Sequence, residues 1–316
     1  TFSITVNGTN DDPALTAAPV VLANATEDTE YNISVAQLLT GFSDADASDT
    51  LKIEALTAYK NNADGTVSDE TAGTFTKQTD DDGNTTGYVF KPLKNFNGDV
   101  TLTYTVSDGN GPGTQNSLAL TIDAVNDGPV ATYKAASAVT ESNVVLQQAD
   151  FLTGQLTATD IEVDTAEELA TSLTYSLASA SIDGAAAVND VPGLTINADG
   201  SWSFDPSNNA YNFLAVGETQ TIDVTYQVQD ADGLTATNTF SITVNGTNDD
   251  PALTAAPVVL ANATEDTDYN ISVAQLLTGF SDSDTSDTLK VEALTAYKNN
   301  ADGTISDETA GTFTKQ

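Results

Sequence analysis

Apolar and polar residues alternate with a period of two along much of this chain. Such alternation predicts strands of antiparallel sheets that bury one face and leave the other in water. The clearest runs, each with apolar residues at every second position, are 100–106, 118–122, 222–228 and 240–244. Residues 2–6 copy the last of these, so a strand is predicted there as well.

Helical periodicity is nearly absent, whereas turn signals are dense. One short helical turn is predicted at Val35-Ala36-Gln37-Leu38-Leu39, with a copy at 273–277. Asn, Asp and Gly cluster at 62–65, 80–84 and 197–200, where they favour tight turns. Many short strands and frequent turns are typical of Greek-key sandwiches. We therefore predict an all-β chain of tandem Greek-key β-sandwich domains, of the immunoglobulin or cadherin kind, joined end to end.

The chain contains a long internal repeat and a short recurring word. Residues 239–316 restate residues 1–78, and the five differences are conservative: Glu30/Asp268, Ala45/Ser283, Ala47/Thr285, Ile53/Val291 and Val67/Ile305. The word Asn-Asp-x-Pro occurs three times, each time after an alternating apolar run. Its Pro favours an extended backbone at the preceding residue. We name the three words the N-terminal joint (10–13), the central joint (126–129) and the C-terminal joint (248–251).

The joints predict the domain organisation. We expect the last strand of a preceding domain at 1–9, one sandwich at 10–126, a second at 127–248, and a partial third at 249–316 that repeats 11–78. Because the chain starts inside a strand pattern, with no signal peptide before it, we expect a segment of a longer array of two alternating domain types. The partial domain ends before its own closing strands and is expected to be the least well specified.

Large apolar residues on the predicted inward faces are the expected core. In the first sandwich these are Tyr31, Leu38, Leu39, Phe42, Leu51, Phe90, Phe96, Leu102, Tyr104 and Val106. In the second they are Phe151, Leu152, Leu173, Tyr175, Trp202, Phe204, Leu214, Val224 and Tyr226.

Charge narrows the possible partners. The 316 residues carry 46 acidic and 9 basic side chains, a net charge of -37 at pH 7, with no basic residue from Ala135 to Leu289. Nucleic acids and anionic membrane surfaces need basic patches, so neither is an expected partner. No run is apolar and long enough for membrane insertion. The charge instead suits a protein that binds divalent cations, because bound cations relieve self-repulsion.

The residue types that are missing argue against an enzyme. The chain has no Cys, His or Arg, so disulfides, the usual zinc ligands, nucleophile–base pairs and phosphate clamps are absent. Gly-rich phosphate loops are absent too. Paired carboxylates serve glycosidases, but here they are predicted in linker loops and not in a cleft.

Acidic residues recur at matching places in each unit. In a sandwich, the incoming linker, the B–C loop and the F–G loop lie at one end, while the A–B turn and the outgoing linker lie at the other. Acids from two consecutive domains should therefore meet at each joint. The predicted ligands are Asn10, Asp11, Asp44, Asp46 and Asp108 at the N-terminal joint; Glu27, Asp28, Asn126 and Asp127 with Asp160, Glu162, Asp164, Asp230 and Asp232 at the central joint; and Glu141, Asn248, Asp249 and Asp250 with Asp282 and Asp284 at the C-terminal joint. Glu265 repeats the position of Glu27 in the partial domain.

Calcium is the predicted ion at these joints. It takes six to eight oxygen ligands from carboxylates, amides and backbone carbonyls, whereas magnesium tends to keep its water. The alternative is that acids in turns are simply solvated and shape the turn. We prefer that alternative for Asp64, Asp81, Asp82 and Asp199, since a Gly follows each closely. The N-terminal joint lacks most of its upstream partner and is expected to be the emptiest.

Several short sequence motifs resemble those of known bacterial repeats. Residues 10–126 resemble the cadherin-like bacterial immunoglobulin repeat of giant surface adhesins, through Ala25-Thr26-Glu27-Asp28-Thr29, Asn95-Phe96-Asn97-Gly98, Tyr104-Thr105-Val106-Ser107-Asp108-Gly109 and Val125-Asn126-Asp127. Residues 127–250 resemble the VCBS repeat, through Leu152-Thr153-Gly154-Gln155-Leu156, Ala158-Thr159-Asp160, Asn197-Ala198-Asp199-Gly200-Ser201-Trp202 and Asp230-Ala231-Asp232-Gly233. The VCBS family usually spaces two Asp by one residue, whereas this chain has Asp160-Ile161-Glu162-Val163-Asp164, so either Glu162 or Asp164 is the ligand.

The resemblance implies a structural role outside the cell. It implies extender segments of secreted RTX-type adhesins at the bacterial cell surface and in biofilms, with calcium at the interdomain linkers. We expect a monomeric extended chain whose partners are neighbouring repeats, with the adhesive ligand bound elsewhere. The alternative function is a glycan- or surface-binding β-sandwich module. Trp202, the only Trp, alternates with serines, which predicts a core position and not a ligand platform.

Overall fold

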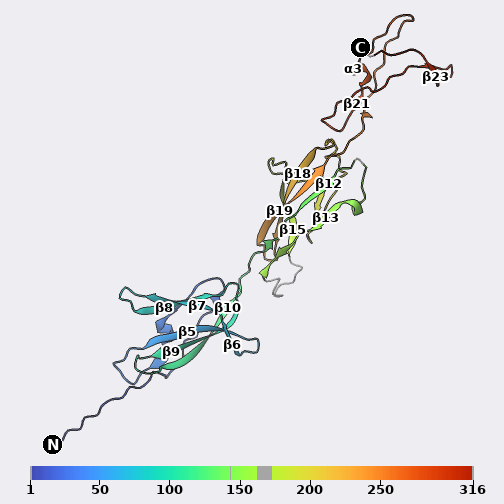
Figure 1. The fold of residues 1–316 in the computed structure, drawn as a ribbon. Coiled ribbons are helices and arrows are strands. Elements are labelled where there is room, and N and C mark those ends of the chain that lie inside the picture. Colours follow the sequence, from blue (N-terminus) through green and yellow to red (C-terminus); the bar gives the residue numbers. More distant parts are fainter. Residues whose placement is uncertain (1, 143, 162–172, 315–316) are drawn as a thin grey trace. The chain divides into compact units, whose positions relative to one another are not determined.

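The computed structural model describes residues 2–142, 144–161 and 173–314, so the predicted ligands Glu162 and Asp164 lie outside the described residues. The chain divides into two compact units, residues 1–127 and 128–316 (Figure 1). Apart from short helical turns, the described structure consists of strands and loops, and the predicted all-β sandwich class is confirmed.

The first unit is a sandwich of two sheets. The larger sheet consists, in spatial order, of β2 (Ala25–Thr26), β10 (Thr114–Asp123), β9 (Gly98–Ser107), β5 (Lys52–Asn61) and β6 (Val67–Thr71). The smaller sheet consists of β3 (Tyr31–Ser34), β8 (Thr85–Pro92) and β7 (Gly73–Thr79), and β1 (Ala14–Leu15) pairs with β4 (Phe42–Ser43). All pairs are antiparallel except β2 with β10, which is parallel.

Alternation places the core between these sheets. Leu102, Tyr104 and Val106 of β9 are at most 2% exposed, while the threonines between them lie on the outer face. The Tyr104 hydroxyl donates a hydrogen bond to the Leu38 carbonyl oxygen at 3.0 Å, which satisfies a buried polar group. Leu38 ends the predicted helical turn, α1 (Val35–Leu38). All ten predicted core residues of this domain are in or against the core, so that prediction is confirmed.

The helical turn has a local cause. Ser34 precedes α1 and Gln37 stands three residues later, and the two form a capping box in which each side chain bonds the other residue's backbone N–H. Such boxes satisfy N–H groups that a helix end leaves unpaired. The copy, α3 (Val273–Leu276), has the same box.

The second unit begins with another sandwich. Its larger sheet consists, in order, of β12 (Ala136–Thr140), β19 (Thr235–Asn245), β18 (Thr219–Gln229) and β15 (Thr174–Ile182). Its smaller sheet consists of β13 (Leu152–Gln155), β17 (Ser201–Phe204) and β16 (Leu194–Ile196); β11 (Val130–Ala131) pairs with β14 (Ala158–Thr159), and η1 (Gln148–Asp150) is a 3-10 turn. β12 runs parallel to β19.

The second core contains most of the residues expected in it. Trp202 is 2% exposed and packs on Phe240, with ring centroids 4.8 Å apart, which confirms its predicted core position. Phe151 and Leu173 were predicted in the core, and this is wrong: both are half-buried and outside the cluster. Phe151 follows η1 and Leu173 precedes β15, so each lies at the end of an element where packing is incomplete.

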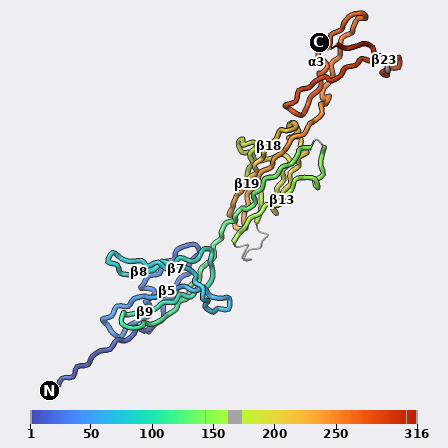
Figure 2. Tube along the Cα trace, in the orientation of Figure 1, coloured from blue at the N-terminus to red at the C-terminus, as the bar shows by residue number. Residues whose placement is uncertain are grey.

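Residues 249–314 contain few strands. They form α3 and two ribbons, β20 (Ala252–Leu253) with β21 (Phe280–Ser281), and β22 (Tyr297–Asn299) with β23 (Ile305–Thr309). The strand predicted at 2–6 does not form in the described structure, and Phe2 is 86% exposed. Figure 2 shows this N-terminal stretch with no other segment beside it. Its sequence copy lies within β19 and pairs on both sides, with β12 and β18.

Candidate metal sites at the domain joints

The N-terminal joint is fastened to the loop after β4. The Asp11 N–H donates to Asp46 Oδ2 at 2.9 Å, and the Asp46 N–H donates to Asp44 Oδ1 at 2.8 Å. These bonds hold two B–C loop carboxylates beside the linker. Such local carboxylate-to-backbone bonds are typical of Asp in turns.

Asp108 completes this group from the F–G loop after β9. The Asn110 N–H donates to Asp108 Oδ1 at 2.7 Å, and the Asn10 side chain also bonds this carboxylate. The bond from Asn110, and then that from Asn10, lower the pKa of Asp108, so its carboxylate is ionised at neutral pH. The structure therefore brings together Asn10, Asp11, Asp44, Asp46 and Asp108.

The opposite end of the first domain presents Glu27 to the outgoing linker. The Glu27 N–H donates to the Asp123 carbonyl oxygen at 3.1 Å, which extends the parallel pairing of β2 with β10. Glu27 Oε1 accepts from the Val125 N–H at 2.7 Å, and the side chain is 5% exposed. The carboxylate is thus held against the residue that precedes Asn126.

Asn95 joins this end, although sequence reasoning assigned it no role. Its N–H donates to Asp28 Oδ1 at 3.0 Å, and its Nδ2 donates to Asp127 Oδ2. One side chain thereby links the A–B turn acid to the linker acid. The sequence signals were its place before the alternating run that forms β9 and its membership of the motif Asn95-Phe96-Asn97-Gly98.

Asp160 and Asp230 are buried within the second unit. They are 3% and 4% exposed and follow β14 and β18. Asp230 Oδ1 accepts from the N–H groups of Gly233 and Leu234, at 2.6 and 2.8 Å. Asp232 in the same loop is exposed. The two ion pairs among the described residues, Lys60–Glu70 and Lys298–Glu308, involve none of these acids.

The C-terminal joint brings acids of two domains together within the second unit. Glu141 Oε1 accepts from the N–H of Thr247, at 2.8 Å, and from its hydroxyl. The Asp249 N–H donates to Asp284 Oδ2 at 2.8 Å, and the Asp284 N–H donates to Asp282 Oδ1 at 3.1 Å. Glu141, Asp249 and Asp284 are 3%, 6% and 1% exposed.

The surroundings of Asp284 disfavour its charged form. Burial raises the pKa of its carboxyl group; the charges of Asp249, Asp282 and Asp287 raise it further, while the bond from the Asp249 N–H acts in the opposite direction. Like charges brought together in a poorly solvated place favour either a proton or a cation.

Three predicted ligands near this joint are not drawn into the buried group. Asn248 and Asp250 are exposed, and the Asn248 side chain donates to the Asp249 carbonyl oxygen at 2.9 Å. Glu265 is exposed in the turn before α3. Of the turn acids judged to be structural, Asp64 and Asp199 each accept bonds from both the N–H and the hydroxyl of the residue two positions later.

The buried carboxylates have the donor chemistry of a calcium site. In the described part of the chain, no three acidic side chains are gathered closely enough to hold an ion as they stand. However, Asp44, Asp108, Glu141 and Asp284 each have a buried carboxylate oxygen with no hydrogen-bond partner. Leaving a buried charged group unsatisfied costs several kcal/mol, and an oxygen-ligated hard cation would satisfy it. The residues therefore fit calcium.

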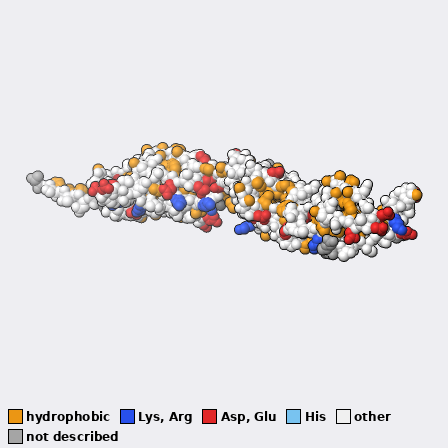
Figure 3. All heavy atoms as spheres, turned by 90° about the horizontal axis from the view of Figure 1, so that it is seen from above, with side chains coloured by type: hydrophobic (Ala, Val, Ile, Leu, Met, Phe, Trp, Pro, Cys, Tyr) orange, Lys and Arg blue, Asp and Glu red, His pale blue; other side chains and the backbone are white. Residues whose placement is uncertain are grey.

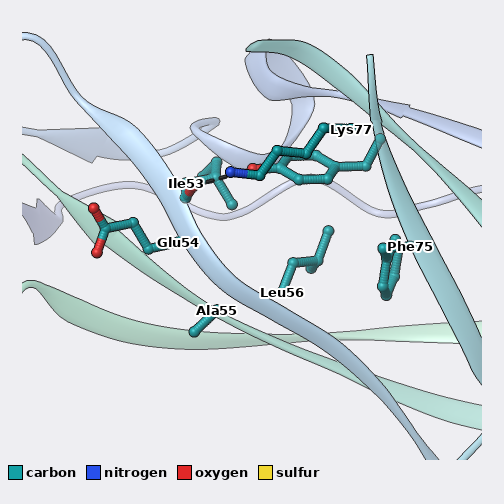
Figure 4. A pocket seen from close by; sticks show the side chains of 7 residues that line it. Ile53, Glu54, Ala55, Leu56, Phe75 and Lys77 are labelled. Carbon is teal, nitrogen blue, oxygen red and sulfur yellow. Dashed lines mark hydrogen bonds between the residues drawn. The ribbon is translucent and has the colours of Figure 1, made fainter. Parts of the chain in front are cut away.

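The surface away from the joints and a pocket in the first domain are weaker candidates for a functional site. Figure 3 shows Asp and Glu side chains in groups, with fewer Lys side chains on the visible face. A pocket of about 140 Å³ lies in the first domain, lined by Ile53, Glu54, Ala55, Leu56, Phe75, Lys77 and Tyr88. Figure 4 shows the Glu54 carboxylate turned away from Leu56 and Phe75. With one carboxylate in its lining, this pocket lacks the pair that glycoside hydrolysis requires.

The described structure contains consecutive β-sandwich domains with buried acids next to their linkers. Residues 9–123 and 247–316 match the cadherin-like domain, and residues 126–246 match the bacterial cadherin-like domain. The chain belongs to the cadherin-like domain family. Domains of this family are extracellular structural and adhesion modules, are typically non-enzymatic, and generally bind calcium. The assignment of the second domain to VCBS repeats stays a prediction.

Solved structures of animal cadherin ectodomains are similar to the chain. Protocadherin gamma C5 EC1-3 is 13% identical, with 74% of this chain and 68% of that chain covered and a TM-score of 0.41. Mouse clustered PcdhgC3 EC1-3 is 14% identical, with 74% of this chain and 67% of that chain covered and a TM-score of 0.38. The human desmocollin-1 ectodomain is 19% identical, with 76% of this chain and 41% of that chain covered and a TM-score of 0.33. No curated protein matches the chain.

The helices in the described part of the chain are short. None of them combines the length and the apolar character that crossing a bilayer requires.

Proposed function

We propose that this chain is an extender segment of a secreted, RTX-type bacterial surface adhesin, in which calcium at the joints stiffens an otherwise flexible array. The observation that carries the proposal is the set of joint carboxylates with buried, unpartnered oxygens: Asp44, Asp108, Glu141 and Asp284. No lysine occurs between Ala135 and Leu289 to neutralise those of the second unit. The chain would act as a monomer that holds an adhesive tip, located elsewhere in the protein, away from the cell.

Each joint would act through residues of two consecutive domains. At the C-terminal joint, Glu141 and Asp249 from one side and Asp282 and Asp284 from the other would hold the ion. At the central joint the proposed ligands are Glu27, Asp28, Asn126 and Asp127 before the linker, with Asp160, Asp230 and Asp232 after it. A bound Ca²⁺ supplies the positive charge that lets these carboxylates approach each other. Without it their mutual repulsion keeps the linkers flexible.

Small-angle X-ray scattering of the full chain tests the stiffening. The maximum dimension is measured in EDTA and then across a calcium titration from micromolar to about 10 mM, because extracellular modules bind at about 10⁻⁴–10⁻³ M. We expect it to increase and its distribution to narrow as calcium is added. Magnesium at the same ionic strength is the matched control and should have less effect. A maximum dimension that does not change with calcium would contradict the proposal.

A second variant set separates calcium binding from general charge effects. Asp160→Asn and Asp230→Asn remove charge from buried positions, whereas Asp199→Asn removes the same charge from an exposed turn. The first two should weaken the calcium response of the scattering curve, and Asp199→Asn should leave it unchanged. Equal effects of all three would indicate simple screening of a highly charged chain.

A further inference from the structure

Both complete domains carry an Asn-Phe pair in the loop before the strand that ends at the F–G loop. In the first domain Asn95-Phe96 precedes β9, and in the second Asn212-Phe213 precedes β18. Phe96 and Phe213 are partly buried and pack against their own cores. A packed aromatic ring fixes the position of the loop, and therefore the direction in which the neighbouring amide points.

In the first domain this amide reaches the outgoing linker. Asn95 bonds the Asp28 carboxylate through its N–H and the Asp127 carboxylate through its Nδ2. Asp127 occupies the position in the central joint that Asp249 occupies in the C-terminal joint. By this correspondence, we expect Asn212 to lie beside Asp249.

The contacts of the second loop agree with this placement. The Phe213 carbonyl oxygen accepts from the N–H and the hydroxyl of Thr285, at 3.3 and 3.4 Å, so the loop touches the residue that follows Asp284. Gly246 allows the loop to lie against the linker, since a Cβ there would be 2.2 Å from the Leu214 carbonyl oxygen. The loop is therefore held at the joint from both domains.

Asn212 differs from Asn95 in one respect that points to a ligand. Its Oδ1 is buried and has no hydrogen-bond partner in the described structure. Glu141 Oε2 and Asp284 Oδ1, on side chains that are 3% and 1% exposed, are in the same condition. Buried acceptors without donors are uncommon, and one bound cation would satisfy all three at this joint.

We propose that Asn212 supplies an uncharged side-chain oxygen to the calcium site of the C-terminal joint, alongside the carboxylates of Glu141, Asp249 and Asp284. This inference rests on the proposed function and adds a ligand from a loop that lies outside the Asn-Asp-x-Pro motif of the joint. Calcium accepts amide oxygens readily, and a neutral ligand raises the coordination number without adding negative charge to an already crowded group. Asn212 would then help to select a cation that takes many oxygen ligands.

Calcium titration of the full chain by isothermal calorimetry tests the role of Asn212. Asp284→Asn first identifies the binding step that belongs to the C-terminal joint, because that step should be weakened or lost. Asn212→Ala should then lower the affinity of the same step by about tenfold or more, on the scale seen when a metal site loses a supporting group. Asn212→Asp keeps an oxygen in place and should restore the binding.

Asn208→Ala is the matched control, because Asn208 lies in the same loop and its Oδ1 accepts from the Ala210 N–H at 3.0 Å. It should leave the calcium affinity unchanged. Thermal unfolding in EDTA supplies a readout without metal. A ligand role predicts that Asn212→Ala changes the melting temperature in calcium and not in EDTA. An equal fall in both conditions with unchanged affinity would show a purely structural role and overturn the inference.

The failure of this inference is distinguishable from that of the proposed function. If Asp284→Asn removes a binding step while Asn212→Ala binds as the unaltered chain does, the inference is wrong and the proposed function stands. If the unaltered chain binds no calcium, both are wrong.

Discussion

Residues 13–76 and 251–314 have nearly the same sequence and different structures. In the first copy, ten residues form β5, which pairs with β9 and β6 across a complete sheet. In the second copy, only Tyr297–Asn299 of the matching stretch is a strand. Leu38 is fully buried, whereas its counterpart Leu276 is only half-buried. The difference shows that alternation alone does not make a sheet: β3 and β5 form because residues 79–123 supply β8, β9 and β10 as partners.

Local features, in contrast, are the same in both copies. The capping box recurs, the β1–β4 ribbon recurs as β20–β21, and the Lys60–Glu70 ion pair at 3.0 Å recurs as Lys298–Glu308 at 2.8 Å. The bond from Asp11 to Asp46 likewise recurs from Asp249 to Asp284. Half of a joint site therefore forms without the completed sheets of its domain.

Completing the second copy should have the largest effect. Residues 79–126, appended after Gln316, would supply the strands that β8, β9 and β10 provide in the first copy. We expect a new cooperative unfolding transition, since a folded domain is stable by about 5–15 kcal/mol. Calorimetry and amide hydrogen exchange would detect it. The same 48 added residues in scrambled order are the control, and an equal gain from them would contradict the explanation.

Leu38→Ala and Leu276→Ala should lower the free energy of unfolding by very different amounts. Truncating a fully buried Leu costs about 2–5 kcal/mol, so Leu38→Ala should lower the free energy of unfolding of the first domain by that amount. Leu276→Ala should have little effect because Leu276 packs less completely. Urea unfolding of the full chain measures both. Similar losses would mean that the second copy has a core of its own.

Asp284→Asn and Asp46→Asn compare the two joint sites. Asp284 is 1% exposed, whereas Asp46 is half-buried and its partner Asp11 is exposed. Calcium affinity measured by calorimetry should fall on the order of 10- to 100-fold for Asp284→Asn and less for Asp46→Asn. The Asp282→Asn and Asp44→Asn pair is a second matched comparison. A larger loss at Asp46 would reverse the expected order of the joints.

Thr285→Ala gives the second copy the residue found at the matching position 47 of the first. It removes the hydroxyl bond to the Phe213 carbonyl oxygen and keeps the backbone bond. The stability of the second unit in EDTA should fall by at most about 1 kcal/mol. Ala47→Thr should change nothing measurable in the first unit. Thermal unfolding of both variants would settle the point, and a gain on Thr285→Ala would contradict the contact.

The two copies should not differ in the pKa values of Asp64 and its counterpart Asp302. The Thr66 hydroxyl and N–H lower the pKa of Asp64, and Thr304 does the same for Asp302. Because the folded pKa is below the unfolded one, these bonds contribute stability above the unfolded pKa, and this is lost as pH falls through the folded pKa. NMR titration should give equal values for the two carboxyl groups. A pKa for Asp302 at its ordinary value would show that the turn depends on the completed sheet.

The sequence showed which stretches can form strands, but not whether each stretch has a partner to pair with. Alternation identified β9, β10, β18 and β19, and sandwich topology correctly placed Asp249 near Asp284. The same alternation wrongly predicted a strand at 2–6, since pairing depends on distant residues. Asn95 and Asn212 were missed because their positions depend on how a neighbouring Phe packs, and this has no periodic signature.

The parallel pairing near the two ends of each domain has a mechanical consequence. β2 pairs with β10 over two residue pairs, and β12 pairs with β19 over five. In both domains one of the paired strands comes early in the chain after the incoming linker and the other is the last strand, so tension on the linkers pulls the paired strands in opposite directions along their length. Hydrogen bonds loaded in shear must break together and not one at a time. The first domain has the shorter parallel pairing and is therefore expected to unfold at the lower force. The second domain is expected to remain folded as the chain lengthens.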